Sequence, residues 1–244
     1  MKYSQVNPDK SLASYIDAYW TVKGDSVNTV TEKILPDGCI DIIFNLGSDC
    51  LTDNGAFNMR SEKVYLVGTM TRFKETIMHS ETRLIGVRFK PAGFSAFHRF
   101  SSLHEIADKT IDYDKTFLFD LKKLSIDHVT YFNRFFLDKF KNPNDFLRQV
   151  IETIQIHKGQ IKVDVLASKH FTTVRQLERS FKQHIGVSPK VLINLTRYQN
   201  AMAAFRQRKP EESLLSIAID QGYYDHAHLT NEFKRYNGVV PTFT

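Results

Sequence analysis

The chain has 244 residues, which is long for one compact domain and suits two. Its 42% hydrophobic and 25% charged residues are typical of a globular protein and exclude a disordered one. Apolar runs stay short of the roughly eighteen residues that a membrane-spanning helix needs, and the N-terminus lacks the apolar core of a signal peptide. The only cysteines are Cys39 and Cys50, so we expect a cytoplasmic protein with no disulfide framework, no metal site and no cofactor.

The net charge of +6 lies entirely in the last third of the chain. Residues 155–244 hold 13 Lys and Arg against 7 Asp and Glu, whereas residues 1–154 hold 20 of each kind. Clustered positive charge suits a polyanionic partner, because neutralised phosphates release condensed counterions. A solvated basic surface explains the same charge, so charge alone leaves both interpretations open.

Residues from about 28 to 90 have the pattern of β-strands. In Cys39–Leu46 and Thr82–Lys90, apolar side chains alternate with polar ones, which predicts half-buried strands. Proline, aspartate and glycine clusters between such runs mark turns. We therefore predict a β-rich sandwich or barrel in a sensor-like domain over residues 1–100.

Residues 101–156 follow a helical pattern instead. Aromatic and aliphatic residues recur at helical spacing through Ile126–Phe140 and Phe146–Ile156. The rings that carry the first pattern are Phe132, Phe135, Phe136 and Phe140. They either pack into a core or form a helical surface for homodimerisation. We treat residues 101–156 as a helical connecting region, with a boundary to the basic part at residue 157.

The last third contains an internal repeat with a period of 52 residues. Its pattern is L-x-x-x-F-K-x-x-x-G-V-x-P, a helix closed by glycine and stopped by proline. The first copy consists of Leu177, Phe181, Lys182, Gly186, Val187 and Pro189, and the second of Leu229, Phe233, Lys234, Gly238, Val239 and Pro241. Six identities in register indicate a duplicated structural unit.

Each copy has the construction of a helix-turn-helix unit. Short amphipathic segments, Val163–His170 and Leu214–Gln221, precede the repeated helices. Thr173 and Asp225 are good helix N-caps, and Thr173 is followed three residues later by glutamine, as in a capping box. The first turn is one residue shorter than the second.

The two turns also differ in the residue at their centre. Gly222 accepts the positive φ that such a turn needs. Phe171 occupies the aligned position in the first unit, where a bulky residue in left-handed geometry would cost roughly 1–2 kcal/mol. We therefore expect the first turn to bend differently.

Between the units, Val191–Arg208 is predicted to be one helix with an apolar face. At 1.5 Å per residue it spans about 27 Å. Such a helix could hold two reading helices about one DNA turn apart, roughly 34–36 Å, so that one chain reaches successive major grooves.

Residues 155–244 resemble the AraC/XylS family of bacterial regulators. The resemblance rests on A-S-K-H-F-T-T-V-R-Q-L-E-R-S-F-K-Q-H-I-G-V-S-P and A-I-D-Q-G-Y-Y-D-H-A-H-L-T-N-E-F-K-R-Y-N-G-V-V-P. It implies an α+β multidomain chain whose all-α domain, residues 157–244, inserts the second helix of each unit into the major groove. Its reading residues would be Arg175, Glu178 and Arg179 in the first unit and His226, His228 and Asn231 in the second.

These residue types suit recognition of bases. Arginine can bind guanine bidentately, glutamate can accept from cytosine, and asparagine can bind adenine bidentately. Lys182 and Lys234 are expected nearer phosphates, where they add affinity rather than sequence choice. Asn231 departs from the family, which commonly carries arginine there, so the second unit would read other bases or bind more weakly. For His226 and His228 a solvated helix face is the alternative.

The front half shows a looser resemblance to an N-terminal domain of some of these regulators. It rests on L-P-D-G-C-I-D, V-G-T-M-T and G-V-R-F-K-P. Such domains imply effector sensing or dimerisation, often on a cupin-like β framework. Asp41 and Arg88 oppose the apolar sides of their strands and could meet in a polar pocket, or form a structural ion pair. Trp20 is a candidate ligand contact or a core residue.

Two other classes of function compete with a DNA-binding regulator. An enzyme is not expected, because only His79 lies within the strands, no phosphate-binding or nucleophile motif is present, and Cys39 is as well explained as a small buried thiol. The second is a helical protein-interaction module attached to a small-molecule-binding β domain. The expected partners are double-stranded DNA, a small-molecule effector, a second copy of the chain and, for an activator, RNA polymerase.

Overall fold

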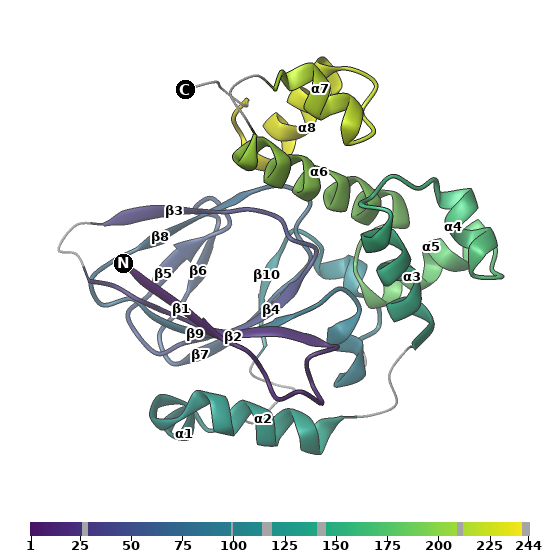
Figure 1. Ribbon diagram of the computed structural model, residues 1–244. Coiled ribbons are helices and arrows are strands. Elements are labelled where there is room, and N and C mark those ends of the chain that lie inside the picture. The colour runs from purple at the N-terminus through teal and green to yellow at the C-terminus, as the bar shows by residue number, and fades with distance from the viewer. Residues whose placement is uncertain (26–28, 99, 114–118, 141–144, 209–211, 241–244) are drawn as a thin grey trace.

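The computed structural model describes residues 1–25, 29–98, 100–113, 119–140, 145–208 and 212–240, and places them in a β-rich N-terminal part and a helical C-terminal part (Figure 1). This agrees with the predicted α+β chain. No helix within these ranges is long and apolar enough to cross a lipid bilayer.

Two antiparallel sheets form the N-terminal part, as expected from its alternating pattern. The larger sheet has the order β1-β2-β9-β4-β7-β10, and the smaller has the order β3-β8-β5-β6. The strands of the larger sheet are β1 Lys2–Val6, β2 Ile16–Lys23, β9 Arg83–Phe89, β4 Ile40–Asn45, β7 Lys63–Val67 and β10 Thr110–Asp112. Those of the smaller sheet are β3 Val30–Ile34, β8 Lys74–Met78, β5 Cys50–Thr52 and β6 Phe57–Met59.

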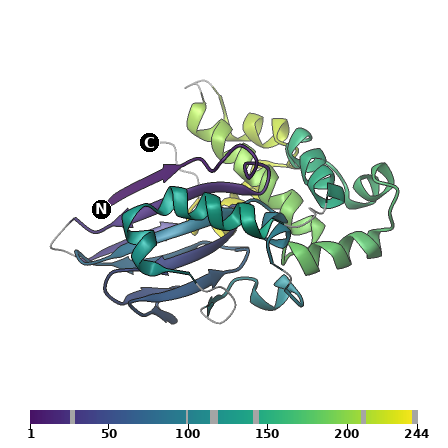
Figure 2. The ribbon, with the colours of Figure 1, turned by 90° about the horizontal axis from the view of Figure 1, so that it is seen from below.

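The outer face of the larger sheet is covered by helices. Two short 3-10 helices, η1 Gly93–Ala96 and η2 Leu103–Ile106, follow β9, and α1 Leu121–Ile126 and α2 His128–Lys139 lie across the sheet (Figure 2). Phe132 and Phe136 of α2 are fully buried in the same cluster as the apolar side of β4 and β9. Core packing is therefore confirmed for these two rings.

The inner face of the larger sheet is also covered, which differs from the prediction. β4 was expected to be half-buried, yet Ile43 and Asn45 on its second face are buried together with Ile42 and Phe44 on its first. The reason is that the smaller sheet closes over this face. Local alternation cannot indicate that closure, because it comes from strands far away in the chain.

Two boundaries differ from the predicted domain limits. β10 pairs with β7, so the larger sheet continues beyond residue 100. Helix α3, Asp145–Ile156, was placed in the connecting region, but Leu147, Val150 and Ile154 are buried in the cluster of the first helix-turn-helix unit. Burial of an amphipathic face, rather than the composition break at residue 157, determines where this unit begins.

The C-terminal part consists of two small helical clusters joined by one long helix. The helices after α3 are α4 Val163–Lys169, α5 Val174–His184, α6 Pro189–Gln207, α7 Leu214–Asp220 and α8 His226–Asn237. Leu192 and Ile193 of α6 belong to the cluster of α3, α4 and α5, and Leu195, Tyr198 and Ala201 belong to that of α7 and α8. The 19 residues of α6 span about 28 Å.

Candidate nucleic-acid interface and cavity

Helix α5 presents the polar face that the sequence predicted. Its N-cap is Thr173, whose hydroxyl accepts a hydrogen bond from the Gln176 backbone while the Gln176 side chain returns to the cap, so the predicted capping box is present. Leu177 and Phe181 are fully buried. The four predicted DNA-contact residues on the other side, Arg175, Glu178, Arg179 and Lys182, are all exposed.

The turn before α5 has the same backbone conformation as the turn before α8, contrary to the prediction. Phe171 has φ 51°, the left-handed conformation that Gly222 adopts in the second unit with φ 75°. The Phe171 amide donates to the Ser168 carbonyl at 3.1 Å, as the Gly222 amide donates to the Ile219 carbonyl at 2.9 Å. The expectation that the first turn bends differently is wrong at this residue, because the hydrogen-bond pattern of the motif imposes the same backbone. The Phe171 side chain is fully exposed.

Helix α8 repeats the arrangement in the second unit. Asp225 caps it by accepting a hydrogen bond from the His228 amide at 2.7 Å, and Gly238 closes it in the left-handed conformation. Leu229 and Phe233 are buried. The predicted contact residues His226, His228, Asn231 and Lys234 are all exposed. Pro241 of the repeat lies outside the described residues.

A buried polar network in the second unit was missed. Glu232 is 7% exposed, accepts a hydrogen bond from the Tyr223 hydroxyl at 2.7 Å, and lies 3.4 Å from the guanidinium of Arg197 on α6. The Arg197 guanidinium also lies over the Tyr223 ring, 4.6 Å from its centroid. These contacts join α6, the turn and α8. Position 180, which corresponds to Glu232 in the repeat, is serine, so the repeat itself gave no signal.

The N-terminal part docks against the C-terminal end of α5. The hydroxyl of Thr69 donates to the Ile185 carbonyl, His104 Nδ1 lies 2.9 Å from the Gly186 carbonyl, and the Ser95 hydroxyl donates to the His184 carbonyl at 3.3 Å. Side chains thus satisfy carbonyls that a helix end leaves without intrahelical partners. Ser101 and Ser102 of the same part line a groove with the four contact residues of α5.

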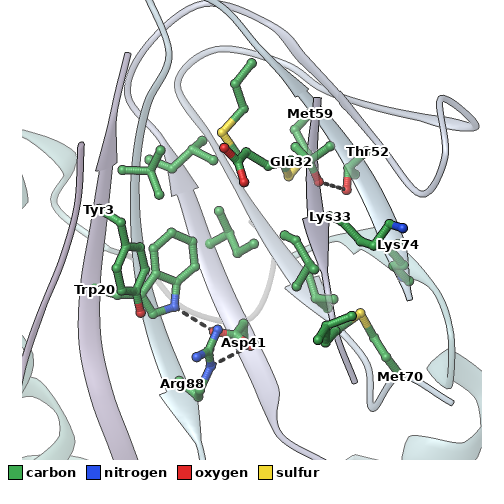
Figure 3. Close-up of a pocket in the computed structure, with 18 of the residues that line it drawn as sticks. Tyr3, Trp20, Glu32, Lys33, Asp41, Thr52, Met59, Met70, Lys74 and Arg88 are labelled. Atoms are coloured by element: carbon green, nitrogen blue, oxygen red, sulfur yellow. Dashed lines mark hydrogen bonds and ion pairs between the residues drawn. The ribbon is translucent and has the colours of Figure 1, made fainter. Parts of the chain in front are cut away.

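The structure brings Trp20, Asp41 and Arg88 together at one end of a cavity of about 360 Å³ between the two sheets (Figure 3). The Trp20 indole N–H donates to Asp41 at 2.6 Å, and the Arg88 guanidinium lies 3.4 Å from Asp41 and 3.3 Å from Asp37. Both alternatives for Asp41 and Arg88 therefore hold at once, because the pair is an ion pair and also lines a cavity.

Burial raises the pKa values of two groups at this end of the cavity, Asp41 and Cys39. Removal from water raises the pKa of Asp41 to about 6, although Arg88 opposes the shift. Burial also raises the pKa of the Cys39 thiol, with a further contribution from Asp37. A nucleophilic cysteine needs the opposite shift, so this environment does not favour the Cys39 thiolate.

The opposite end of the cavity holds a second ion pair. Lys74 Nζ lies 2.6 Å from Asp53, which also accepts from the backbone and hydroxyl of Thr110. His79 follows β8 and its Nδ1 lies 3.1 Å from the Thr29 hydroxyl. Among the described residues, no three His, Cys, Asp or Glu side chains come close enough together to hold a metal ion.

Two domain families match the chain. Residues 4–112 match DUF6597, described as a domain of unknown function, and residues 166–244 match a helix-turn-helix domain family. Among solved structures, that of unsaturated fatty acid-bound ToxT from Vibrio cholerae aligns with a TM-score of 0.50 at 14% identity over 91% of each chain. That likeness shows the fold, a β-rich domain followed by helix-turn-helix units.

The relatives in sequence are transcription regulators. An HTH-type transcriptional regulator from Haemophilus influenzae is 39% identical over 93 residues, which are 38% of this chain and 30% of that protein. The transcriptional activator RhaS from Escherichia fergusonii is 26% identical over 106 residues, 43% of this chain and 37% of that protein. The matches thus span less than two fifths of the length of these relatives. The chain therefore carries an N-terminal DUF6597 domain and a C-terminal helix-turn-helix domain of the AraC type.

Proposed function

We propose that the chain binds a specific duplex DNA sequence through α5 and α8, and that a small molecule in the N-terminal cavity controls this binding. The observation that carries the proposal is the duplicated, capped helix with buried leucine and phenylalanine on one side and exposed polar residues on the other. A helical protein-interaction module needs no such duplication of cap, core and exposed face. A regulator of promoters works beside the chromosome, in the cytoplasm.

The two reading helices divide their residues between bases and phosphates. Arg175, Glu178 and Arg179 lie within the first six residues of α5, the part of a recognition helix that reaches base edges. Lys182 lies one turn further along and suits a phosphate. In α8 the residues proposed for the same roles are His226, His228 and Asn231 for bases and Lys234 for a phosphate, so the second unit carries less positive charge on its base-reading turns.

Three segments that wall the cavity also hold the C-terminal part, which provides a route from effector to DNA. Lys33 of β3 lines the cavity and its ammonium donates to the Asn237 carbonyl at the end of α8, at 3.2 Å. Thr69, which binds the end of α5, is followed by Met70 in the cavity wall. Movement of these segments would therefore change how both reading helices are held.

The third segment, which contains Asp37 and Gly38, contacts the long helix α6. Asp37 lines the cavity and holds Arg88, and the next residue, Gly38, lies against α6. A Cβ at Gly38 would come within 2.9 Å of the Leu192 side chain, so the two parts are in close contact here. Gly38 has φ 81°, which a residue with a side chain adopts only with strain. A cavity ligand that displaced Asp37 would press on the junction between the two helical clusters.

The proposal for an effector rests on this cavity and its contacts. The unsaturated fatty acid in the compared ToxT structure is a ligand of that protein. A second copy of this chain and RNA polymerase stay predictions from the sequence.

Selection of binding sites from a random duplex library with the full chain tests the DNA-binding proposal. We expect one enriched motif, with affinity that falls steeply as salt concentration rises. Arg179→Ala should weaken binding to this site and relax the preference at one base pair, whereas Arg134→Ala, on the exposed face of α2, should change neither. Failure to enrich a motif, or equal effects of the two substitutions, would contradict the proposal.

A further inference from the structure

The corner of the cavity that holds Asp41 is bordered by two aromatic rings, Trp20 and Tyr3. The Trp20 indole lies against Gly86, where a Cβ would come within 2.0 Å of the ring, so only glycine leaves room for it. The Tyr3 ring is stacked beside Trp20, with centroids 6.5 Å apart and an angle of 28° between the planes. Aromatic faces attract cations through the negative potential of their π-systems.

The same corner carries more negative than positive charge. The Arg88 guanidinium lies between two carboxylates, Asp41 and Asp37, and can neutralise only one of them. The other cations of the cavity wall are engaged elsewhere: Lys74 pairs with Asp53 at the opposite end, Lys33 binds the Asn237 carbonyl, and the Met1 ammonium pairs with Asp25. A further carboxylate, Glu32, also lines the cavity. One unit of negative charge is therefore left beside two aromatic rings (Figure 3).

The rest of the cavity wall is apolar and adaptable. Four of the five methionines of the chain line it: Met1, Met59, Met70 and Met78. Unbranched thioether side chains adjust to irregular or flexible apolar groups. A volume of about 360 Å³ lies in the range of small-molecule sites, which combine apolar walls with a few polar groups that fix orientation.

We propose that the cavity binds an organic cation, a protonated amine or amidine on an apolar body, with the charged group between Asp41, Asp37 and the faces of Trp20 and Tyr3. This inference rests on the proposed function, because it names the class of effector for that site. The apolar body lies among the methionines. An anionic head group would instead meet two carboxylates, and a neutral one would leave the excess negative charge uncompensated.

The proposal also gives the direction of a pH effect. Protonation of Asp41 below about pH 6 removes the excess negative charge, so amine binding should weaken there. The ionisable and charged groups around this corner are Tyr3 on β1, Asp17 on β2, Asp37 and Cys39 before β4, and Arg88 on β9. Arg88 keeps its charge over this range, and the elevated pKa of Cys39 keeps its thiol neutral.

The test uses the full chain and three probes that share an apolar body: n-octylamine, n-octanol and octanoate. Isothermal titration at pH 7.5 should show octylamine binding at least about tenfold more tightly than either of the others. Asp41→Asn should remove most of this preference and leave octanol binding unchanged. Asp37→Asn is a second variant with the same expected effect, and Asp112→Asn, an exposed carboxylate on β10, is the matched control and should behave as the unmodified chain.

Several outcomes would overturn the inference. Octanoate binding as tightly as octylamine would assign the cavity to anions, and equal binding of octanol would show that charge has no role. Absence of binding by all three probes, or an unchanged amine preference in both aspartate variants, would show that the cavity is not an amine-binding site. Operator binding is measured on the same protein preparations. It separates failure of this inference from failure of the DNA-binding proposal, because α5 and α8 can bind DNA whether or not the cavity binds an amine.

Discussion

The two helix-turn-helix units share a backbone and differ in what surrounds it. Both have a capped second helix, a left-handed residue in the turn and buried leucine and phenylalanine at positions 52 apart. The first unit meets the N-terminal part through the carbonyls at the end of α5. The second meets the N-terminal part through Lys33 and the Asn237 carbonyl, and in addition has an internal network of Glu232, Tyr223 and Arg197. The repeated residues therefore determine the shape of the unit, whereas its stability and regulation depend on residues that do not repeat.

The largest expected effect comes from the network that only the second unit has. Glu232→Ala leaves the buried Arg197 and Tyr223 without their common acceptor, and loss of one member of a buried charged pair costs about 3–5 kcal/mol. Ser180→Ala, at the corresponding position of the first unit, should cost less than about 0.5 kcal/mol. Urea denaturation of both variants measures the difference. Equal effects would show that the network does not stabilise the second unit.

A second buried carboxylate, Asp41, has its pKa raised to about 6 by burial. The folded chain then binds a proton more tightly than the unfolded chain, so this contribution to stability is full below about pH 4 and is lost as pH rises through 6. From pH 4 to pH 7, the free energy of unfolding of the unmodified chain should fall by roughly 2–3 kcal/mol more than that of the Asp41→Asn variant. Denaturation of both proteins across this range measures it, and parallel pH profiles would contradict it.

The reading faces should differ in strength. Arg179 and Asn231 occupy equivalent positions, but only arginine adds charge to a bidentate contact. Arg179→Ala should cost about 1–3 kcal/mol of operator binding, and Asn231→Ala a smaller amount at a different base pair. Fluorescence anisotropy with operators altered at single positions tests both. A larger loss for Asn231→Ala would reverse the assigned order of the two units.

The smallest expected effect is at the turns. Phe171→Gly removes a strained left-handed residue whose side chain is fully exposed, so we expect a gain of about 1 kcal/mol in stability. Gly222→Ala should lose a similar amount, because its φ is 75° and an added Cβ would lie 2.9 Å from the Gln160 side chain. Thermal denaturation measures both changes. A loss of stability in Phe171→Gly would mean that the phenylalanine ring makes a stabilising contact.

Sequence reasoning located the C-terminal elements closely, because local signals define them. The helices preceding α5 and α8 end within one residue of their predicted limits, and both N-caps lie where the repeat placed them. The prediction for the turn at Phe171 was wrong because the hydrogen bonds of the surrounding turn override the preference of a single bulky residue against positive φ. The exposed reading faces followed from the same register, whereas Glu232 did not, because its partner Arg197 lies 35 residues away.

The N-terminal site could be predicted only in part. Alternation placed Asp41 and Arg88 on the polar sides of β4 and β9, and these strands pair so that the two residues are directly opposite. The cavity itself depends on the smaller sheet, whose pairing of β3 with β8 joins residues forty or more positions apart. No local pattern indicates such a pairing, so the enclosure of the space above Asp41 could not be predicted.

Operator spacing tests whether one chain reads two successive major grooves through α5 and α8, which α6 connects. The measurement is the affinity of the full chain for its selected operator with five base pairs inserted between the two recognised blocks. Because about half a helical turn moves the blocks to opposite faces of the duplex, we predict that affinity falls to that of a single block. Unchanged affinity would contradict the account, because it would show that the two units do not bind together across one turn of DNA.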